Sequence, residues 1–251
     1  MTRPINHNGS KIAWQNWTVY VGPLAIYMLL GSMILAVWER IEIQLIANQS
    51  PEVVLTIVVV RLVSILALVI WGFPKIKQDF PIHVSPLAIA VGVIGAAIWI
   101  ALCRLNLESK LLAVLGLASD LFGSRDAINP WDLFESPSER NLFLMNRFSL
   151  LIIAVPLAEE LFLRGFLLRY LTDPDWPGVT LDKIGRSAIG TTAIYGALTH
   201  PSEWISAAIW FSVVTLLMLR TRRFWDCVVA HAVTNGILGA YILLAQDWRL
   251  W

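Results

Sequence analysis

The sequence predicts an all-α protein, a polytopic membrane helical bundle with about seven transmembrane helices. Of its 251 residues, 57% are hydrophobic and only 15% are charged, and the mean hydropathy is +0.66. Soluble domains contain about 45–50% apolar and about 25% charged residues. The composition therefore indicates a chain surrounded by membrane lipid. A net charge of +1 gives no indication of a nucleic-acid partner.

Seven apolar segments approach the length of about 20 residues that a transmembrane helix needs. They are Trp17–Trp38, Val53–Phe73, Pro86–Leu105, Phe148–Leu171, Ser187–His200, Glu203–Arg220 and Phe224–Leu244. The fifth is too short to cross a bilayer alone, and the proline after His200 is expected to end it partway. Residues 106–147, between the third and fourth segments, are expected to form an interfacial helix and a cap over a cavity.

Lysine and arginine predict the orientation of the bundle, because they are enriched in cytoplasmic loops. With seven spans, three basic clusters fall on the side of Arg3 and Lys11. They are Lys75 and Lys77; Arg164, Arg169, Lys183 and Arg186; and Arg220, Arg222 and Arg223. The N-terminus is therefore predicted to be cytoplasmic and the C-terminus to lie outside.

The most informative segment is the charged run at residues 159–164, inside an otherwise apolar span. Each ionisable side chain at that depth costs roughly 2.5–3.5 kcal/mol, so such groups are functional by default. Glu160 and Arg164 are four residues apart, share a helix face and can form an ion pair. Glu159 lies about 100° around the helix and is left to accept a proton as a general base. The alternative is a purely structural ion pair between helices.

Polar residues also interrupt two further apolar segments, nearer the C-terminus. His231 and Asn235 are four residues apart on one face of the seventh span, and both can donate hydrogen bonds to an oxyanion that develops during attack on a carbonyl. Such groups also hydrogen-bond across helices simply to hold them together. His200, at the end of the short fifth span, carries a weaker signal. A carboxylate and two histidines could hold zinc, and Glu159, His200 and His231 would be its ligands. Because these residues come from three separate helices, their spacing neither supports nor excludes zinc, and the site is expected to work without a cofactor.

In this order, E-E-x-x-x-R (Glu159, Glu160 and Arg164), a histidine (His200) and H-x-x-x-N (His231 and Asn235) resemble the motifs of the CAAX protease and bacteriocin-processing family of intramembrane proteases. The resemblance covers roughly residues 151–244. It divides the chain into N-terminal transmembrane helices with an interfacial loop (residues 1–147) and a catalytic core (residues 148–251). The family has phenylalanine four residues before its second-motif histidine, where this chain has Gly196, with Tyr195 beside it.

Three C-terminal stretches also resemble the branch of CAAX prenyl protease-related proteins found with bacterial exosortase sorting systems. They are Asn129–Trp131, His200–Trp204 and Gln246–Trp251. The resemblance implies a location in the bacterial inner membrane. The expected partner is a membrane-anchored protein or peptide substrate.

The resemblance implies a role for each motif residue. Glu159, helped by His200, would activate a water, while His231 and Asn235 would stabilise the oxyanion. Glu160 and Arg164 would support the site. The predicted function is therefore an intramembrane endopeptidase. One alternative is a non-proteolytic helper that binds a partner in a sorting or immunity system, and another is a proton-coupled transporter, which would need a path to both faces and repeat symmetry.

Overall fold

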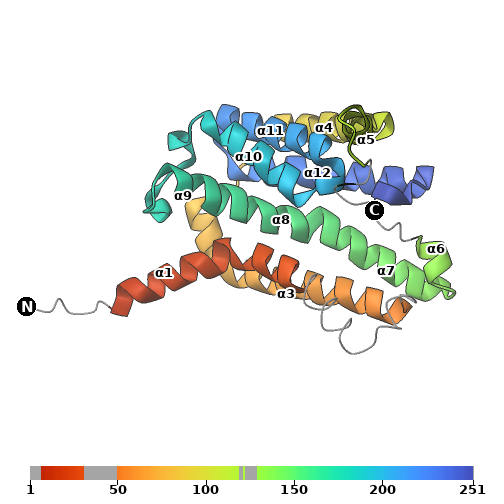
Figure 1. The fold of residues 1–251 in the computed structure, drawn as a ribbon. Coiled ribbons are helices and arrows are strands. Elements are labelled where there is room, and N and C mark those ends of the chain that lie inside the picture. The colour runs from red at the N-terminus through yellow and green to blue at the C-terminus, as the bar shows by residue number, and fades with distance from the viewer. Residues whose placement is uncertain (1–6, 31–49, 119–120, 122–128, 251) are drawn as a thin grey trace, which may run out of the picture.

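The computed structural model describes residues 7–30, 50–118, 121 and 129–250, and these residues form an all-α membrane helical bundle (Figure 1). The main helices are α1 (His7–Tyr20), α3 (Pro51–Asp79), α4 (Pro86–Leu105), α5 (Leu107–Val114), α6 (Pro130–Leu133), α7 (Pro137–Ser149), α8 (Val155–Glu160), α9 (Leu168–Thr172), α10 (Ser187–Thr199), α11 (Trp204–Thr221) and α12 (Phe224–Ala245). Two π-helical segments, η1 (Leu150–Ala154) and η2 (Leu161–Leu167), join α7 to α8 and α8 to α9.

Four described stretches are long and apolar enough to cross a membrane: α3, α4, the run Pro201–Thr221 that ends in α11, and α12. They correspond to the second, third, sixth and seventh predicted spans. The fourth predicted span is helical throughout, but its helix begins at Pro137 rather than at Phe148 and alternates between α and π geometry. The first predicted span, Trp17–Trp38, runs into residues 31–49, outside the described residues. The total of seven spans remains a prediction.

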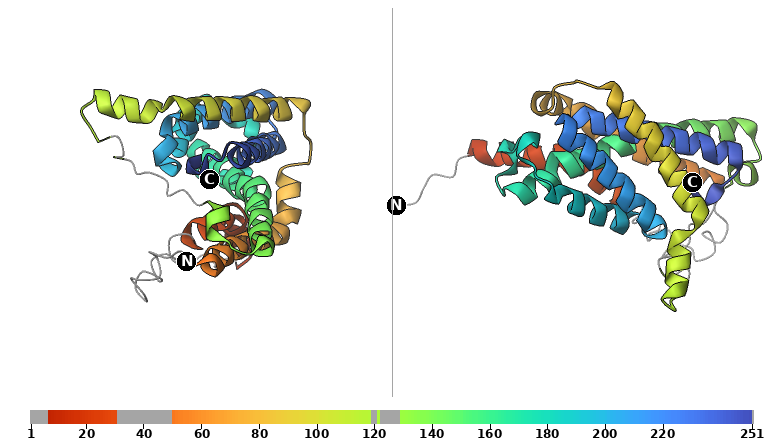
Figure 2. Two further views of the ribbon diagram at one scale, coloured as in Figure 1. Left: turned by 90° about the vertical axis from the view of Figure 1, so that its right-hand side faces the viewer. Right: turned by 90° about the horizontal axis from the view of Figure 1, so that it is seen from above.

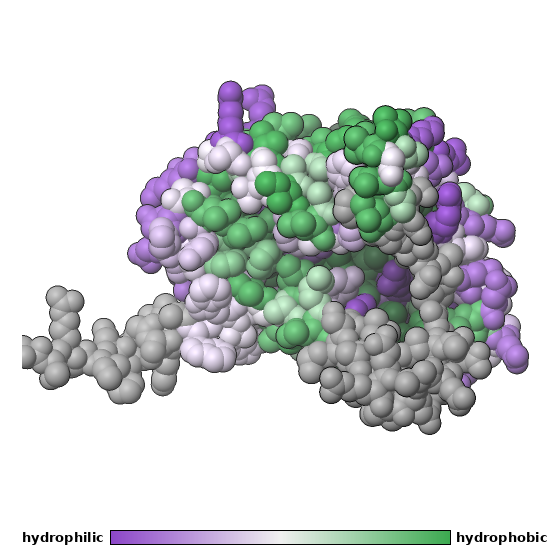
Figure 3. Space-filling model, in the orientation of Figure 1, coloured by the Kyte–Doolittle hydropathy of each residue, from purple (hydrophilic) through white to green (hydrophobic). Residues whose placement is uncertain are grey.

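The continuous run from α7 to α9 is the centre of the bundle. In Figure 1 and in the left-hand view of Figure 2 it lies between α1 and α3 on one side and the group formed by α4, α10, α11 and α12 on the other. It packs against α3 on one side and α12 on the other. Its position explains why an ionisable pair on α8 is buried. The face drawn in Figure 3 has broad hydrophobic areas over its middle and upper part, with hydrophilic residues toward its ends, as expected for a wall that faces lipid.

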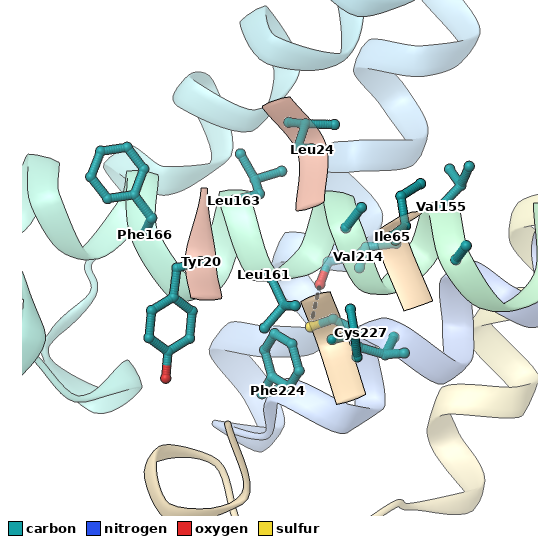
Figure 4. Packing of buried hydrophobic residues seen from close by; sticks show 14 of the residues in the cluster. Tyr20, Leu24, Ile65, Val155, Leu161, Leu163, Phe166, Val214, Phe224 and Cys227 are labelled. Carbon is teal, nitrogen blue, oxygen red and sulfur yellow. Dashed lines mark hydrogen bonds between the residues drawn. The ribbon is translucent and has the colours of Figure 1, made fainter. Parts of the chain in front are cut away.

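The hydrophobic core joins the first helices to the last ones. Figure 4 shows Tyr20 and Leu24, Ile65 of α3, Leu161 and Phe224 packed around the central run. Between α4 and α12, close packing depends on Gly92: an added Cβ there would lie 2.7 Å from the carbonyl oxygen of Ala230. Small residues of this kind let membrane helices approach closely.

Three arginines from two of the predicted basic clusters line a common hollow at one end of the bundle. They are Arg169, Arg222 and Arg223, and Asp79 and Asp182 line the same hollow. The guanidinium of Arg222 donates to the carbonyl oxygens of Leu181 and Ile184, at 2.7 and 2.9 Å. At the opposite end of α4 the chain turns at Asn106, and α5 extends away from the bundle (Figure 2). This short helix lies within the segment expected to be interfacial.

Candidate active site

The two predicted carboxylates lie at the end of α8, between the two π-helical segments. The first segment ends where the amide of Val155 bonds to the carbonyl oxygen of Leu150, five residues earlier. Pro156 follows and has no amide hydrogen. In an α-helix the Leu151 carbonyl would accept from the amide of Val155, which here bonds to Leu150 instead. In a π-helix it would accept from residue 156, which is a proline. The Leu151 carbonyl therefore has no donor in its own helix. Short π segments in α-helices are frequent at functional sites.

Asn235 supplies the missing donor. Its Nδ2 atom donates to the carbonyl oxygen of Leu151 over 2.9 Å. The predicted oxyanion donor on α12 is thus bound to the helix that carries the glutamates. An asparagine amide has two N–H groups, so this bond uses only part of its donor capacity.

Glu160 and Arg164 form the ion pair that their spacing predicts. Glu160 Oε2 lies 2.9 Å from Arg164 Nη1, and neither side chain is exposed. Arg164 Nη2 also donates to the hydroxyl of Thr215 on α11, over 3.1 Å. That hydroxyl lies 2.8 Å from Thr192 Oγ1 on α10. The pair therefore links the central run to two other helices.

His231 bridges the two glutamates. Its Nδ1 lies 3.1 Å from Glu160 Oε1, and its Nε2 lies 3.6 Å from Glu159 Oε2. The ring is held edge-on to Trp210, with centroids 4.5 Å apart. The Trp210 indole donates to Thr234 Oγ1 over 3.1 Å, one turn along α12 from the histidine. Both ring nitrogens thus face carboxylates, a different arrangement from the oxyanion donor that the motif suggests.

The charged groups differ in how closely they are paired. Glu160 and Arg164 form an ion pair at 2.9 Å, whereas the Glu159 carboxylate lies 3.6 Å from the His231 ring. Buried charge is tolerated only when it is paired and hydrogen-bonded. Glu159 therefore lies beside the ion pair and is not part of it.

His200 reaches the same site from the end of α10. The helix stops at Thr199, partway through the bundle, as the shortness of the fifth span predicts. Thr199 Oγ1 lies 3.0 Å from His200 Nδ1 and also donates to the carbonyl of Tyr195. The threonine hydroxyl therefore orients the imidazole ring.

Gly196 explains the departure from the family's second motif. A Cβ at this position would lie 2.6 Å from the ring of Phe211 and 2.9 Å from the carbonyl oxygen of Ala207. The Phe211 ring of α11 lies 5.9 Å from the ring of His200 and 6.3 Å from that of His231. An aromatic group thus stands beside both histidines, but α11 supplies it.

All four predicted catalytic residues line one cavity of about 330 Å³: Glu159, His200, His231 and Asn235. In the right-hand half of Figure 3 the surface is hollowed, and hydrophilic atoms lie inside the hollow. A water occupies about 30 Å³ of liquid volume, so the cavity has room for a water and part of a substrate.

Comparison with known proteins gives one match. Residues 141–237 match the family model described as type II CAAX prenyl endopeptidase Rce1-like. We refer to these residues as the Rce1-like segment, which covers less than half of the chain. No curated protein and no solved structure matches the chain. The matching family is one of endopeptidases, and the apolar helices of the chain make it an integral membrane protein. The exosortase-associated branch stays a prediction.

The Rce1-like segment contains Glu159, Glu160, Arg164, His200, His231 and Asn235. Across residues 7–30, 50–118, 121 and 129–250, no group of three or more His, Cys, Asp and Glu side chains is arranged to hold a metal ion. The conditional zinc ligands Glu159, His200 and His231 share the cavity without forming such a group.

Several residues around the site were not identified from the sequence. Thr199 and Thr215 orient His200 and Arg164, and Trp210 holds His231. Arg61 and Arg147 line the cavity. A serine or threonine in an apolar span carries no distinguishing pattern, because its hydroxyl can always bond to its own helix. Only the charge of the two arginines could have marked them in the sequence.

Proposed function

We propose that this protein is an intramembrane endopeptidase that hydrolyses a peptide bond of a membrane-anchored protein or peptide. The observation that carries the proposal is the gathering of Glu159, His200, His231 and Asn235 around one cavity inside an apolar bundle. A carboxylate beside an imidazole in a partly dry cavity is suited to general base catalysis. The Rce1-like match supports the same class of reaction.

In the proposed reaction, Glu159 takes a proton from a water while the water oxygen bonds to the scissile carbonyl carbon. The carbonyl oxygen becomes an oxyanion. When the intermediate collapses, the carbon–nitrogen bond breaks, and the proton held by Glu159 passes to the leaving nitrogen. We assign to His200 the binding of the same water.

His231 and Asn235 are assigned two roles each. The contacts of His231 with both glutamates suit it to position Glu159 and to share its proton. Asn235 uses one N–H to hold Leu151, and its second N–H is the proposed donor to the oxyanion. One such donor typically contributes about 100–1000-fold in rate.

The experiment compares cells that produce the wild-type protein with cells that produce Glu159→Gln. Mass spectrometry of the peptides in their membranes should reveal C-termini that form with the wild-type protein and depend on Glu159. Loss of the base should reduce their formation by roughly 100-fold or more. The matched control is Glu52→Gln, because Glu52 is exposed at the start of α3.

Identical termini in wild-type and Glu159→Gln membranes, with both proteins equally folded, would remove the protease proposal. A non-proteolytic binding protein would then be the better account. In the proposed topology, the bundle lies in a bacterial inner membrane with its N-terminus in the cytoplasm and its C-terminus outside.

A further inference from the structure

The short helix α5 contacts the bundle through one face. Glu108 and Leu112 are buried, and they share that face because they are four residues apart. In Figure 1 this helix is seen nearly end-on, while α3 and the central run lie across the picture. In the right-hand view of Figure 2 it points away from the other helices. The axis of α5 therefore lies across the direction of the bundle, at the end where α4 finishes.

The exposed side of α5 is apolar on one arc. Leu111, Val114 and Leu115 are 41%, 83% and 62% exposed. At about 100° of turn per residue, they share an arc of about 100°. Ser109 and Lys110 are exposed on the remaining part of the helix. An apolar arc beside a polar arc is typical of helices that lie in the plane of a membrane interface.

Neighbouring side chains mark this end of the bundle as the level of a membrane interface. Arg104, in the last turn of α4, donates through Nε to the hydroxyl of Tyr241 over 2.9 Å. The centroid of the exposed Trp131 ring lies 5.5 Å from that of Trp248. Tryptophan and tyrosine are enriched where lipid meets water. Because Leu105 is also exposed, the lipid-facing surface of α4 continues into the apolar arc of α5.

Glu108 connects α5 to the loop that carries His200. Its Oε1 atom accepts a hydrogen bond from the amide of Ile205 over 3.3 Å. That amide lies in the first turn of α11, where amides have no acceptor within the helix. One 3-10 turn, η5 (Pro201–Glu203), separates α11 from His200, and the amide of Glu203 donates to the His200 carbonyl over 3.1 Å. A shift of α5 would therefore be passed to the His200 end of the cavity.

We propose that α5 is anchored in the lipid interface by Leu111, Val114 and Leu115, and that Glu108 transmits the position of this helix to the loop that carries His200. The partner is the bilayer itself, and Glu108 is a positioning residue. The effect on cleavage rests on the proposed endopeptidase function, but the anchoring does not. Helix α5 lies outside the Rce1-like segment, so this device belongs to the N-terminal part of the chain.

The first measurement places α5 relative to the lipid. Val114→Cys and Lys110→Cys are spin-labelled in a Cys103→Ala background, in which the remaining Cys227 is buried, and reconstituted in phosphatidylcholine nanodiscs. The label at position 114 should be relaxed mainly by oxygen, which concentrates in lipid, and the label at position 110 mainly by a water-soluble nickel chelate. Equal access of the chelate to both labels would overturn the anchoring. Protection of position 114 from both reagents would also overturn it, because a protein partner would then cover the arc.

The second measurement tests the link to the loop. A spin label at Ser202→Cys, in the same background, reports on η5. The label should become more mobile with Glu108→Leu, which removes the acceptor, and stay ordered with Glu108→Gln, which keeps an acceptor oxygen. Glu139→Leu is the matched control, because Glu139 is exposed in the first turn of α7. Equal mobility in Glu108→Leu and Glu139→Leu would overturn the link.

Val114→Asp tests the link without changing Glu108. A carboxylate on the apolar arc should loosen α5 from the lipid, so the label at position 202 should again become more mobile. Ala113→Asp is the matched control, because Ala113 is exposed beside the polar arc. This pair decides the question if Glu108→Leu does not fold, since equal mobility in the two aspartate variants would also overturn the link.

Cleavage separates this inference from the proposed function. Glu108→Leu should reduce the Glu159-dependent C-termini by about tenfold, as expected for the loss of one hydrogen bond to a charged group, and Glu108→Gln should retain most of them. If cleavage depends on Glu159 but is equal in Glu108→Leu and Glu139→Leu, the link is wrong and the endopeptidase stands. If the labels respond as expected and no Glu159-dependent cleavage is found, the anchor stands and the endopeptidase is wrong.

Discussion

Asn235 of α12 donates a hydrogen bond to the main-chain carbonyl of Leu151, over 2.9 Å, in the first π-helical segment. Pro156 leaves that carbonyl without a donor of its own helix. The asparagine therefore compensates for a proline three residues before the proposed catalytic base. Loss of this part-buried hydrogen bond would cost about 0.5–1.5 kcal/mol.

Asn235→Ala should lower the thermal stability of the purified protein by about that amount in the wild-type background. In a Pro156→Ala background the loss should be smaller, because the new amide can donate to Leu151. Thermal unfolding in detergent of the wild type, the two single variants and the double variant measures how strongly the effects of Asn235 and Pro156 depend on each other. Asn146→Ala is the control, since Asn146 donates to the carbonyl of Leu142 on an exposed face. Equal losses in both backgrounds would contradict the compensation.

The buried ion pair should matter more for stability than the proposed base does. Glu160→Gln leaves Arg164 without its partner in a place where neither side chain is exposed. Breaking such a pair typically costs about 3–5 kcal/mol. Glu159→Gln should cost much less, because Glu159 lines the cavity and has the longer contact with His231. Unfolding temperatures of the two variants test this order, and a reversed order would show that Glu160 is dispensable.

Much of the fold follows from apolar runs and their breaks. The predicted span Pro86–Leu105 coincides with α4, and the ends of α12 and α11 lie within a residue of their predictions. Hydrophobic length predicts such spans because the bilayer requires every backbone group to be satisfied within its own helix. The apolar pattern did not predict that the central run begins at Pro137, because the first turns of α7 are polar and lie outside the apolar segment.

The residues that form the site could be predicted from the sequence better than the contacts between them. The i,i+4 spacing of Glu160 and Arg164 predicts their pair, because both residues are on one helix. The contacts of His231 with both glutamates depend on how α12 packs against α8, which no local pattern encodes. The same applies to Asn235, whose bond to Leu151 arises from a change in helix geometry.

Thr199 should affect activity without affecting the fold. Its hydroxyl lies 3.0 Å from His200 Nδ1 and also donates to the carbonyl of Tyr195. Thr199→Val keeps the shape of the side chain but removes this contact to the imidazole ring, so cleavage should slow by about tenfold, the effect of about 1.4 kcal/mol. Thr191→Val is the control, because the hydroxyl of Thr191 donates to the Ser187 carbonyl of its own helix and Thr191 is not among the described residues that line the cavity. Equal rates for the two variants would contradict a positioning role.

Gly196 should not tolerate a side chain. Gly196→Ala would place a methyl group 2.6 Å from the Phe211 ring and 2.9 Å from the carbonyl oxygen of Ala207. The backbone oxygen cannot rotate away, so α10 and α11 must separate, and overpacking of this kind costs about 1–3 kcal/mol. Gly190→Ala on the same helix is the matched control, because nothing lies within 4 Å of a Cβ there.

Thermal unfolding should show a lower midpoint for Gly196→Ala and an unchanged or higher midpoint for Gly190→Ala, since alanine favours a helix by about 1 kcal/mol over glycine. Cleavage should also fall in Gly196→Ala, because the displaced Phe211 ring lies beside both His200 and His231. A Gly196→Ala protein as stable and as active as wild type would show that α10 and α11 are not in close contact.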